Sequence, residues 1–118
     1  MSALNQLPPN IQEKLNRLQQ LQSTLQQLVL QKQRLDIERS ESERALKLLD
    51  SMASDKKVYK SAGAILVEKD KGDVIKELKE RLEFLEMRAK VLTKQEGNAR
   101  ERLTGLQESL QQELKLGA

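Results

Sequence analysis

Residues 54–72 read SDKKVYKSAGAILVEKDKG, and this stretch separates two long segments in which apolar residues recur at alternating steps of three and four. Residues 57–61 contain Val58 and Tyr59, and residues 64–69 contain Ile65 and Val67, which are residue types typical of strands, and Ala62-Gly63 is a turn signal. We therefore expect a β-hairpin at about residues 57–69, with a helix on either side of it.

The two flanking segments carry the heptad pattern of a coiled coil. The first is rich in strong helix formers, and no Pro or Gly occurs between residues 10 and 52. Its expected seam is Leu4, Leu7, Ile11, Lys14, Leu18, Leu21, Leu25, Leu28, Lys32, Leu35, Arg39, Ser42, Leu46, Leu49 and Ala53. The expected seam of the second is Ile75, Leu78, Leu82, Leu85, Ala89, Leu92, Glu96, Ala99, Leu103, Leu106, Leu110 and Glu113. The patterns predict helices at about residues 8–53 and 73–116, each roughly 65 Å long.

Local signals place the ends of these helices. The Pro8-Pro9 pair fits a first helical turn, where a missing N–H costs little. Asp73 follows a glycine and is the expected N-cap of the second helix, and Gly117 is its expected C-terminal residue. Gly97 and Gly105 weaken the second helix by about 1 kcal/mol each relative to Ala, so bending or fraying is expected near them.

Two helices of similar length on either side of a hairpin predict an antiparallel pair. A fold at the midpoint of the chain puts Lys32 near the level of Glu96, and Lys14 near Glu113. Charged residues at seam positions lower stability but help to set register and orientation. The same residues are also compatible with ordinary imperfections of a solvated coiled coil. The predicted fold class is mainly α: a long antiparallel two-helix coiled coil joined by a single β-hairpin.

Apolar residues also gather at the free ends of the two segments, where helices fray and a seam opens. An exposed apolar patch there predicts a binding surface, although a closed coiled-coil end accounts for the same residues. The candidate binding residues are Leu4, Leu7, Ile11, Leu15, Leu18, Leu103, Leu106, Leu110, Leu114 and Leu116.

The hairpin itself needs a cover. A lone two-stranded hairpin is marginally stable, and its edges expose unpaired backbone groups. Consecutive exposed apolar residues need something to bury them, and further copies of the same element are the expected cover. The candidate assembly residues are Val58, Tyr59, Ala64, Ile65, Leu66 and Val67.

Composition argues against several classes of function. The sequence has no His and no Cys, and it has no Gly-rich phosphate loop or metal-ligand spacing, so we expect neither an enzyme nor a cofactor or metal site. The net charge of +3 is small and no aromatic stacking platform is present, which argues against nucleic acid. No apolar run is long enough for a membrane span, and residues 1–10 lack signal-peptide features, so a cytoplasmic protein is expected.

The whole chain resembles a prefoldin subunit of the beta class in its archaeal form. The resemblance rests on Leu7-Pro8-Pro9 before a Gln- and Leu-rich segment, on the central VYKSAGAILV motif of residues 58–67, and on VIKEL at residues 74–78. The single hairpin matters because the alpha class carries two. The central motif is fairly specific, whereas coiled-coil sequence alone is not.

The resemblance implies an ATP-independent co-chaperone built from two alpha and four beta subunits. Its hairpins would assemble into a double β-barrel platform, and the tips of its coiled coils would hold non-native polypeptides and pass them to a group II chaperonin. The alternative is a structural coiled-coil scaffold or spacer with a fixed protein partner. Suppression of the aggregation of unrelated denatured proteins separates the two. A nucleic-acid-binding coiled coil would need a basic stripe, which the balanced charge of residues 73–118 disfavours.

Overall fold

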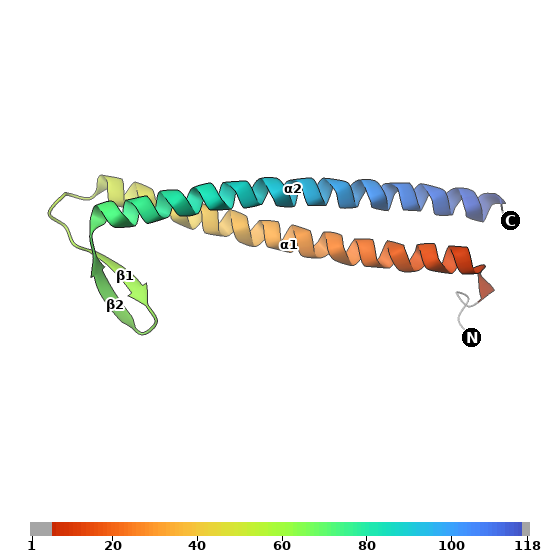
Figure 1. Ribbon diagram of the computed structural model, residues 1–118, viewed down its shortest axis with the longest axis horizontal. Helices are drawn as coiled ribbons and strands as arrows, with labels where there is room; N and C mark the ends of the chain where they lie inside the picture. Colours follow the sequence, from red (N-terminus) through yellow and green to blue (C-terminus); the bar gives the residue numbers. More distant parts are fainter. Residues whose placement is uncertain (1–5, 117–118) are drawn as a thin grey trace. The chain divides into compact units, whose positions relative to one another are not determined.

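The computed structural model describes residues 6–116, which form two helices and a hairpin in the order α1 (Pro9–Ser51), β1 (Val58–Ala62), β2 (Ile65–Lys69) and α2 (Lys71–Leu116) (Figure 1). The chain divides into a terminal unit, Met1–Lys32 with Val91–Ala118, and a hairpin unit, Gln33–Lys90. Both helices contribute residues to both units. The predicted order of helix, hairpin and helix is confirmed.

The start of α1 follows the proline signal. Pro9 is the first helical residue, and the carbonyl of Pro8 accepts hydrogen bonds from the backbone N–H groups of Ile11 at 3.0 Å and Gln12 at 3.1 Å. The side-chain amide of Gln12 also donates to the carbonyl of Leu7 at 2.8 Å. The helix ends at Ser51, so Ala53, the last expected seam residue, lies outside it and is exposed.

The start of α2 differs from the prediction. Asp70, and not Asp73, is the N-cap: its carboxylate accepts a hydrogen bond from the backbone N–H of Asp73 at 3.2 Å, and its carbonyl accepts one from Val74 at 3.1 Å. The helix therefore begins at Lys71, two residues earlier than expected, and includes Gly72. Asp73 lies in the first turn, where a negative charge interacts favourably with the helix dipole.

Two other expectations concern the glycines of the second helix. α2 runs without a break through Gly97 and Gly105, so neither ends the helix. Gly117, the expected C-terminal residue, lies outside the described residues.

The heptad pattern correctly identifies the buried face of each helix. Every expected seam position from Ile11 to Leu49 and from Ile75 to Glu113 is buried or half-buried. In the terminal unit the most buried seam residues are Ile11, Leu92, Ala99 and Leu110, and in the hairpin unit they are Leu35, Ser42, Leu49 and Leu85. Burial of this stripe, and not intrinsic propensity, stabilises helices of this length in water.

The charged seam residues meet as the midpoint fold predicts. In the terminal unit, the ammonium of Lys32 lies 3.5 Å from a carboxylate oxygen of Glu96. Lys14 forms an ion pair with Glu113 and donates to the hydroxyl of Ser109 at 2.9 Å. These pairs fix α1 and α2 as antiparallel neighbours within the unit.

The hairpin unit has its own ion pair between helices. Arg81 of α2 donates from Nε to Glu38 of α1 at 2.8 Å, and its guanidinium lies 5.4 Å from the centroid of the Phe84 ring. The cation therefore interacts with a carboxylate and with the face of an aromatic ring.

The turn of the hairpin is one residue later than the sequence suggested. Ala62 pairs with Ile65, so the two loop residues are Gly63 and Ala64. Gly63 has φ of 61° and no non-glycine residue among those described has a positive φ, which is the pattern of a type II′ turn with glycine at its first central position. Ala64 thus belongs to the turn and not to a strand.

The most buried seam leucine offers a direct test of the coiled coil. Leu92 is 2 % exposed, so Leu92→Ala should lower the free energy of unfolding by about 2–5 kcal/mol through the lost burial and the cavity left behind. Val91 is 45 % exposed, and Val91→Ala should change stability by about 0.5 kcal/mol or less. Chemical denaturation followed by far-UV circular dichroism measures both. Equal effects of the two substitutions would contradict the assigned seam.

Candidate functional site

The hairpin presents apolar side chains on both of its faces. Residues that pair across an antiparallel ladder share a face, and neighbours along a strand alternate. The pairing of Val58 with Lys69, Lys60 with Val67 and Ala62 with Ile65 therefore defines one face, and that of Tyr59 with Glu68 and Ser61 with Leu66 defines the other. The predicted assembly residues are thus divided between two surfaces, a division that the sequence alone did not predict.

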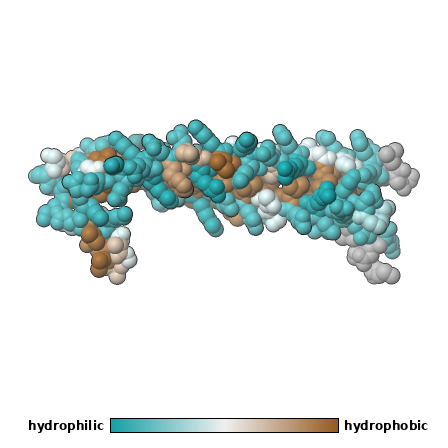
Figure 2. Space-filling model, in the orientation of Figure 1, coloured by the Kyte–Doolittle hydropathy of each residue, from teal (hydrophilic) through white to brown (hydrophobic). Residues whose placement is uncertain are grey.

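Most of these apolar side chains are exposed. Leu66 is 71 % exposed, Ile65 62 %, Tyr59 53 % and Val67 37 %, whereas Val58 is buried. Figure 2 shows the resulting apolar surface on the hairpin. The sheet has two strands, so within the described residues each strand has one unpaired edge. Exposed edges combined with exposed apolar side chains favour association with another chain.

Polar contacts hold the hairpin at the ends of the helices. Lys60 lies 3.4 Å from a carboxylate oxygen of Glu77 in α2, with both side chains more than half exposed. Lys71 donates to the carbonyl of Met52, just beyond the end of α1, at 3.1 Å. Exposed ion pairs contribute little, about 0–1 kcal/mol, so the pair of Lys60 with Glu77 adds little to the position of the hairpin.

The predicted binding leucines lie in the terminal unit and differ in exposure. Ile11 and Leu110 are buried at 7 % and 5 %, so the seam is closed at these two positions and not open as the fraying argument suggested. Leu114 is 50 % exposed. The half-buried members are Leu7, Leu15, Leu18, Leu103 and Leu106. Leu4 and the side chain of Leu116 lie outside the part that the structure describes.

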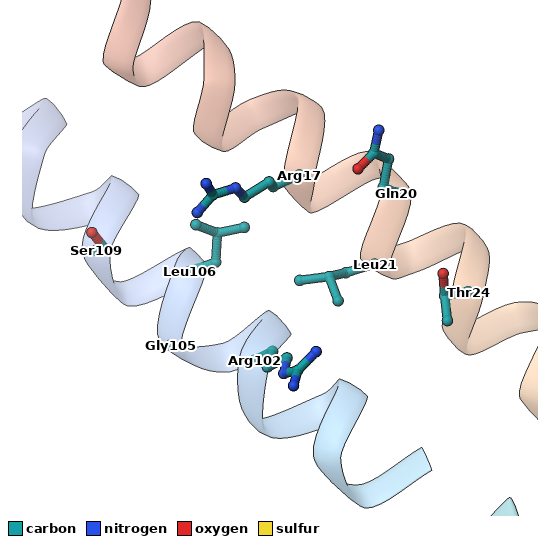
Figure 3. A pocket seen from close by; sticks show the side chains of 8 residues that line it. All are labelled: Arg17, Gln20, Leu21, Thr24, Arg102, Gly105, Leu106 and Ser109. Carbon is teal, nitrogen blue, oxygen red and sulfur yellow. The ribbon is translucent and has the colours of Figure 1, made fainter. Parts of the chain in front are cut away.

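A groove between α1 and α2 in the terminal unit was not predicted. It has a volume of about 600 Å³. Figure 3 shows the residues that line it: Arg17, Gln20, Leu21 and Thr24 of α1, and Arg102, Gly105, Leu106 and Ser109 of α2. Of its lining residues, Leu106 was a predicted binding residue, and Gly105 leaves room in the groove because a Cβ placed there would meet no atom within 4 Å.

A second groove in the same unit is lined by Leu25, Gln26, Val29, Leu30 and Arg100 and has a volume of about 420 Å³. Its single cation is already engaged, because Arg100 donates to Glu96 at 2.9 Å. The two grooves therefore differ in the charge that they offer to a ligand.

The electrostatics of the seam centre on Glu96. Its pKa is lowered, chiefly by the hydrogen bond from Arg100 and further by the charge of Lys32, against an opposing effect of partial burial. At the other seam pair, the second carboxylate oxygen of Glu113 is buried without a hydrogen-bond partner in the described part of the chain. The two cations Arg100 and Lys32 thus favour the ionised form of Glu96.

Neither a metal-ligand cluster nor a membrane-spanning helix is found in residues 6–116. No group of His, Cys, Asp or Glu side chains there is arranged to hold a metal ion. No described helix is both long enough and apolar enough to cross a membrane.

Comparison with known proteins decides the family. The family described as "Prefoldin subunit" matches residues 12–116. The chain belongs to the prefoldin family. It is 41 % identical over 109 residues to the prefoldin subunit beta of Pyrobaculum neutrophilum, covering 92 % of this chain and 86 % of that protein, and equally identical to that of Methanothrix thermoacetophila, covering 92 % and 91 %. The crystal structure of the prefoldin beta subunit from Thermococcus strain KS-1 is also similar, with 37 % identity, a TM-score of 0.80 and coverage of 91 % and 94 %.

These matches confirm the resemblance to the beta class that the sequence motifs indicated. Prefoldin is a chaperone family, and the similar proteins are its archaeal beta subunits. A single hairpin between two long helices is the arrangement that this chain shares with the solved beta subunit.

The lowered pKa of Glu96 predicts how stability depends on pH. The folded-state pKa lies below the unfolded value, so ionised Glu96 stabilises the fold above the ordinary Glu pKa of about 4.3, and that contribution is lost as pH falls through the folded pKa. Glu96→Gln should therefore lower Tm at neutral pH, and the difference from the parent should shrink below about pH 4. Thermal melts across pH measure this.

Glu101→Gln is the matched control, because Glu101 is exposed on the same helix and forms no ion pair among the described residues. It should leave Tm nearly unchanged at every pH. A Tm difference for Glu96→Gln that stays constant from neutral to acid pH would contradict the assigned role of its charge.

Proposed function

We propose that this chain is a subunit of an ATP-independent co-chaperone that holds non-native polypeptides in the cytoplasm and delivers them to a group II chaperonin. The observation that carries the proposal is the hairpin, whose exposed apolar side chains lie on both faces of a two-stranded sheet with unpaired edges. Such an element requires partner strands. Because the chain belongs to the prefoldin family, other prefoldin subunits are the proposed partners.

In the proposed assembly, hairpins from several subunits pair into a closed β-barrel platform. Closure supplies each unpaired edge with a neighbour and buries one face of the hairpin in the barrel. Leu66 and Tyr59 lie on one face, and Ile65 and Val67 on the other, so both the interior and the exterior of such a platform have apolar residues from this chain. The partners are an alpha-class prefoldin subunit and further copies of this chain, with two alpha and four beta subunits expected.

In the proposed mechanism, the leucines of the terminal unit contact the client. The half-buried and exposed members are available without breaking the seam, whereas Ile11 and Leu110 keep it closed. Each leucine contributes about 1.5–3 kcal/mol at most when it is fully buried. Capture therefore depends on several weak apolar contacts acting together, and release needs no nucleotide, since the sequence contains no phosphate-binding loop.

The assembly proposal predicts the outcome of one charge substitution. Leu66→Asp should convert the oligomer to smaller species, because a carboxylate would be buried without a partner at the subunit contact. Leu48→Asp is the control, since Leu48 is 66 % exposed on α1 and Leu66 71 % exposed on β2. Light scattering gives the mass, and far-UV circular dichroism should show unchanged helicity in both. An oligomer unaffected by Leu66→Asp would rule out the hairpin as the platform.

The holding proposal predicts that apolar side chains of the terminal unit are needed collectively. The combined variant Leu7→Ser, Leu15→Ser and Leu114→Ser spares the buried residues Ile11 and Leu110 and should lose most suppression of aggregation of an unrelated denatured protein. Ile37→Ser, Leu48→Ser and Met87→Ser form the control, because these three are 59 %, 66 % and 69 % exposed in the hairpin unit. The control should retain suppression, with or without ATP and magnesium.

Each failure has a distinct meaning. Equal losses in the two combined variants would move the client site away from the terminal unit. No suppression by the parent protein would favour a structural scaffold with a fixed partner. A requirement for ATP in the pure protein would contradict nucleotide-independent holding.

A further inference from the structure

We propose that the groove lined by Leu21, Leu106, Arg17, Arg102 and Gly105 selects extended client segments in which apolar residues stand next to carboxylates. This inference rests on the proposed function, because the ligand is a non-native polypeptide. The groove would distinguish polypeptide segments by their charge, which apolar contact with the leucines alone does not do.

The groove has an apolar floor with room for a chain. The side chains of Leu21 and Leu106 come from opposite helices and point into the space between them (Figure 3). Both are half-buried, so each keeps apolar surface that a ligand can cover. The volume of about 600 Å³ lies within the range of ligand-binding pockets, roughly 300–1,000 Å³. Gly105 contributes to this space because its helical position carries no side chain.

The charge of the lining is entirely positive. Arg17 and Arg102 stand on opposite helices, and no carboxylate is among the lining residues. Arg17 pairs with Glu13 at 2.9 Å, but both side chains are about two-thirds exposed, so an incoming carboxylate displaces a weak contact. No carboxylate of the described residues lies within 4 Å of the Arg102 guanidinium. The groove thus offers two guanidinium groups to an anionic ligand and repels a cationic one.

The remaining lining residues suit a main chain. Gln20, Thr24 and Ser109 supply amide and hydroxyl groups that donate and accept hydrogen bonds, as the carbonyl and N–H groups of an extended segment require. The second groove of the terminal unit lacks this combination, since its one lining cation, Arg100, pairs with Glu96, whose side chain is 17 % exposed and harder to displace than Glu13. The charge preference is therefore assigned to the first groove alone.

The first experiment measures the preference directly on the assembled full-length protein. The probes are three fluorescein-labelled peptides of Gly and Ser with a central Leu-Leu pair, flanked by Glu, Gln or Lys. Fluorescence anisotropy at low salt gives the dissociation constants. The Glu peptide should bind most tightly, by roughly threefold over the Gln peptide, which is the gain expected from one exposed ion pair. The Lys peptide should bind most weakly. The double variant Arg17→Gln and Arg102→Gln should abolish these differences.

The second experiment fills the groove without unfolding the helix. Gly105→Leu places a side chain into open space and replaces a poor helix former, so the fold should be retained or stabilised. It should weaken binding of the Glu peptide by about tenfold, the equivalent of about 1.4 kcal/mol. Gly97→Leu is the matched control, because Gly97 is on the same helix, a Cβ there would also meet no atom within 4 Å, and this residue does not line the groove. It should leave binding unchanged.

The outcomes separate this inference from the proposed function. Equal affinity for the three peptides, or equal effects of Gly105→Leu and Gly97→Leu, overturns the groove proposal even where the parent protein suppresses aggregation. Absence of both peptide binding and suppression overturns the holding function itself. A preference for the Glu peptide that survives the double arginine substitution places the selection elsewhere and also overturns the proposal.

Discussion

Two helices that pair along one heptad seam can bury only one stripe of each, and the rest of this structure depends on that constraint. The stripe is filled mostly by leucine, and the other large apolar side chains, such as Leu48 and Met87, remain in solvent. Of the residues in the two strands, only Val58 is buried. Within the described residues, the geometry that stabilises the helices therefore leaves most apolar side chains of the hairpin exposed.

The charged residues of the seam meet in pairs across the two helices, and such pairs favour one register. A seam made only of leucine is compatible with several registers, because each shift by a heptad brings leucine against leucine. Lys32 with Glu96, and Lys14 with Glu113, meet in one antiparallel register of the terminal unit. A shift of register separates these pairs and leaves charged groups without partners at half-buried positions, which lowers stability. The second hydrogen bond of Lys14, to Ser109, adds to this selection.

The features predicted from the sequence are those set by a repeat or by a short motif. Seam positions and the meeting of Lys32 with Glu96 follow from periodicity and from the midpoint of the chain. The N-cap was misassigned because Asp70 and Asp73 are both suitable carboxylates, and only the backbone path distinguishes them. The two faces of the hairpin depended on a one-residue placement of the turn. The groove was missed because it joins seam leucines and polar residues beside the seam from two helices that are far apart in the sequence.

A closed seam and a client-binding role are compatible because burial in the terminal unit is graded. Ile11 and Leu110 are nearly fully buried and keep the helices paired. Leu21 and Leu106 are half-buried, so part of their apolar surface remains available without any opening of the seam. Because each such contact is partial, it contributes less than a fully buried leucine would, and affinity has to come from several contacts at once. In the proposed function, many weak contacts would favour reversible holding, and the arginines beside them would add selectivity while contributing little to affinity.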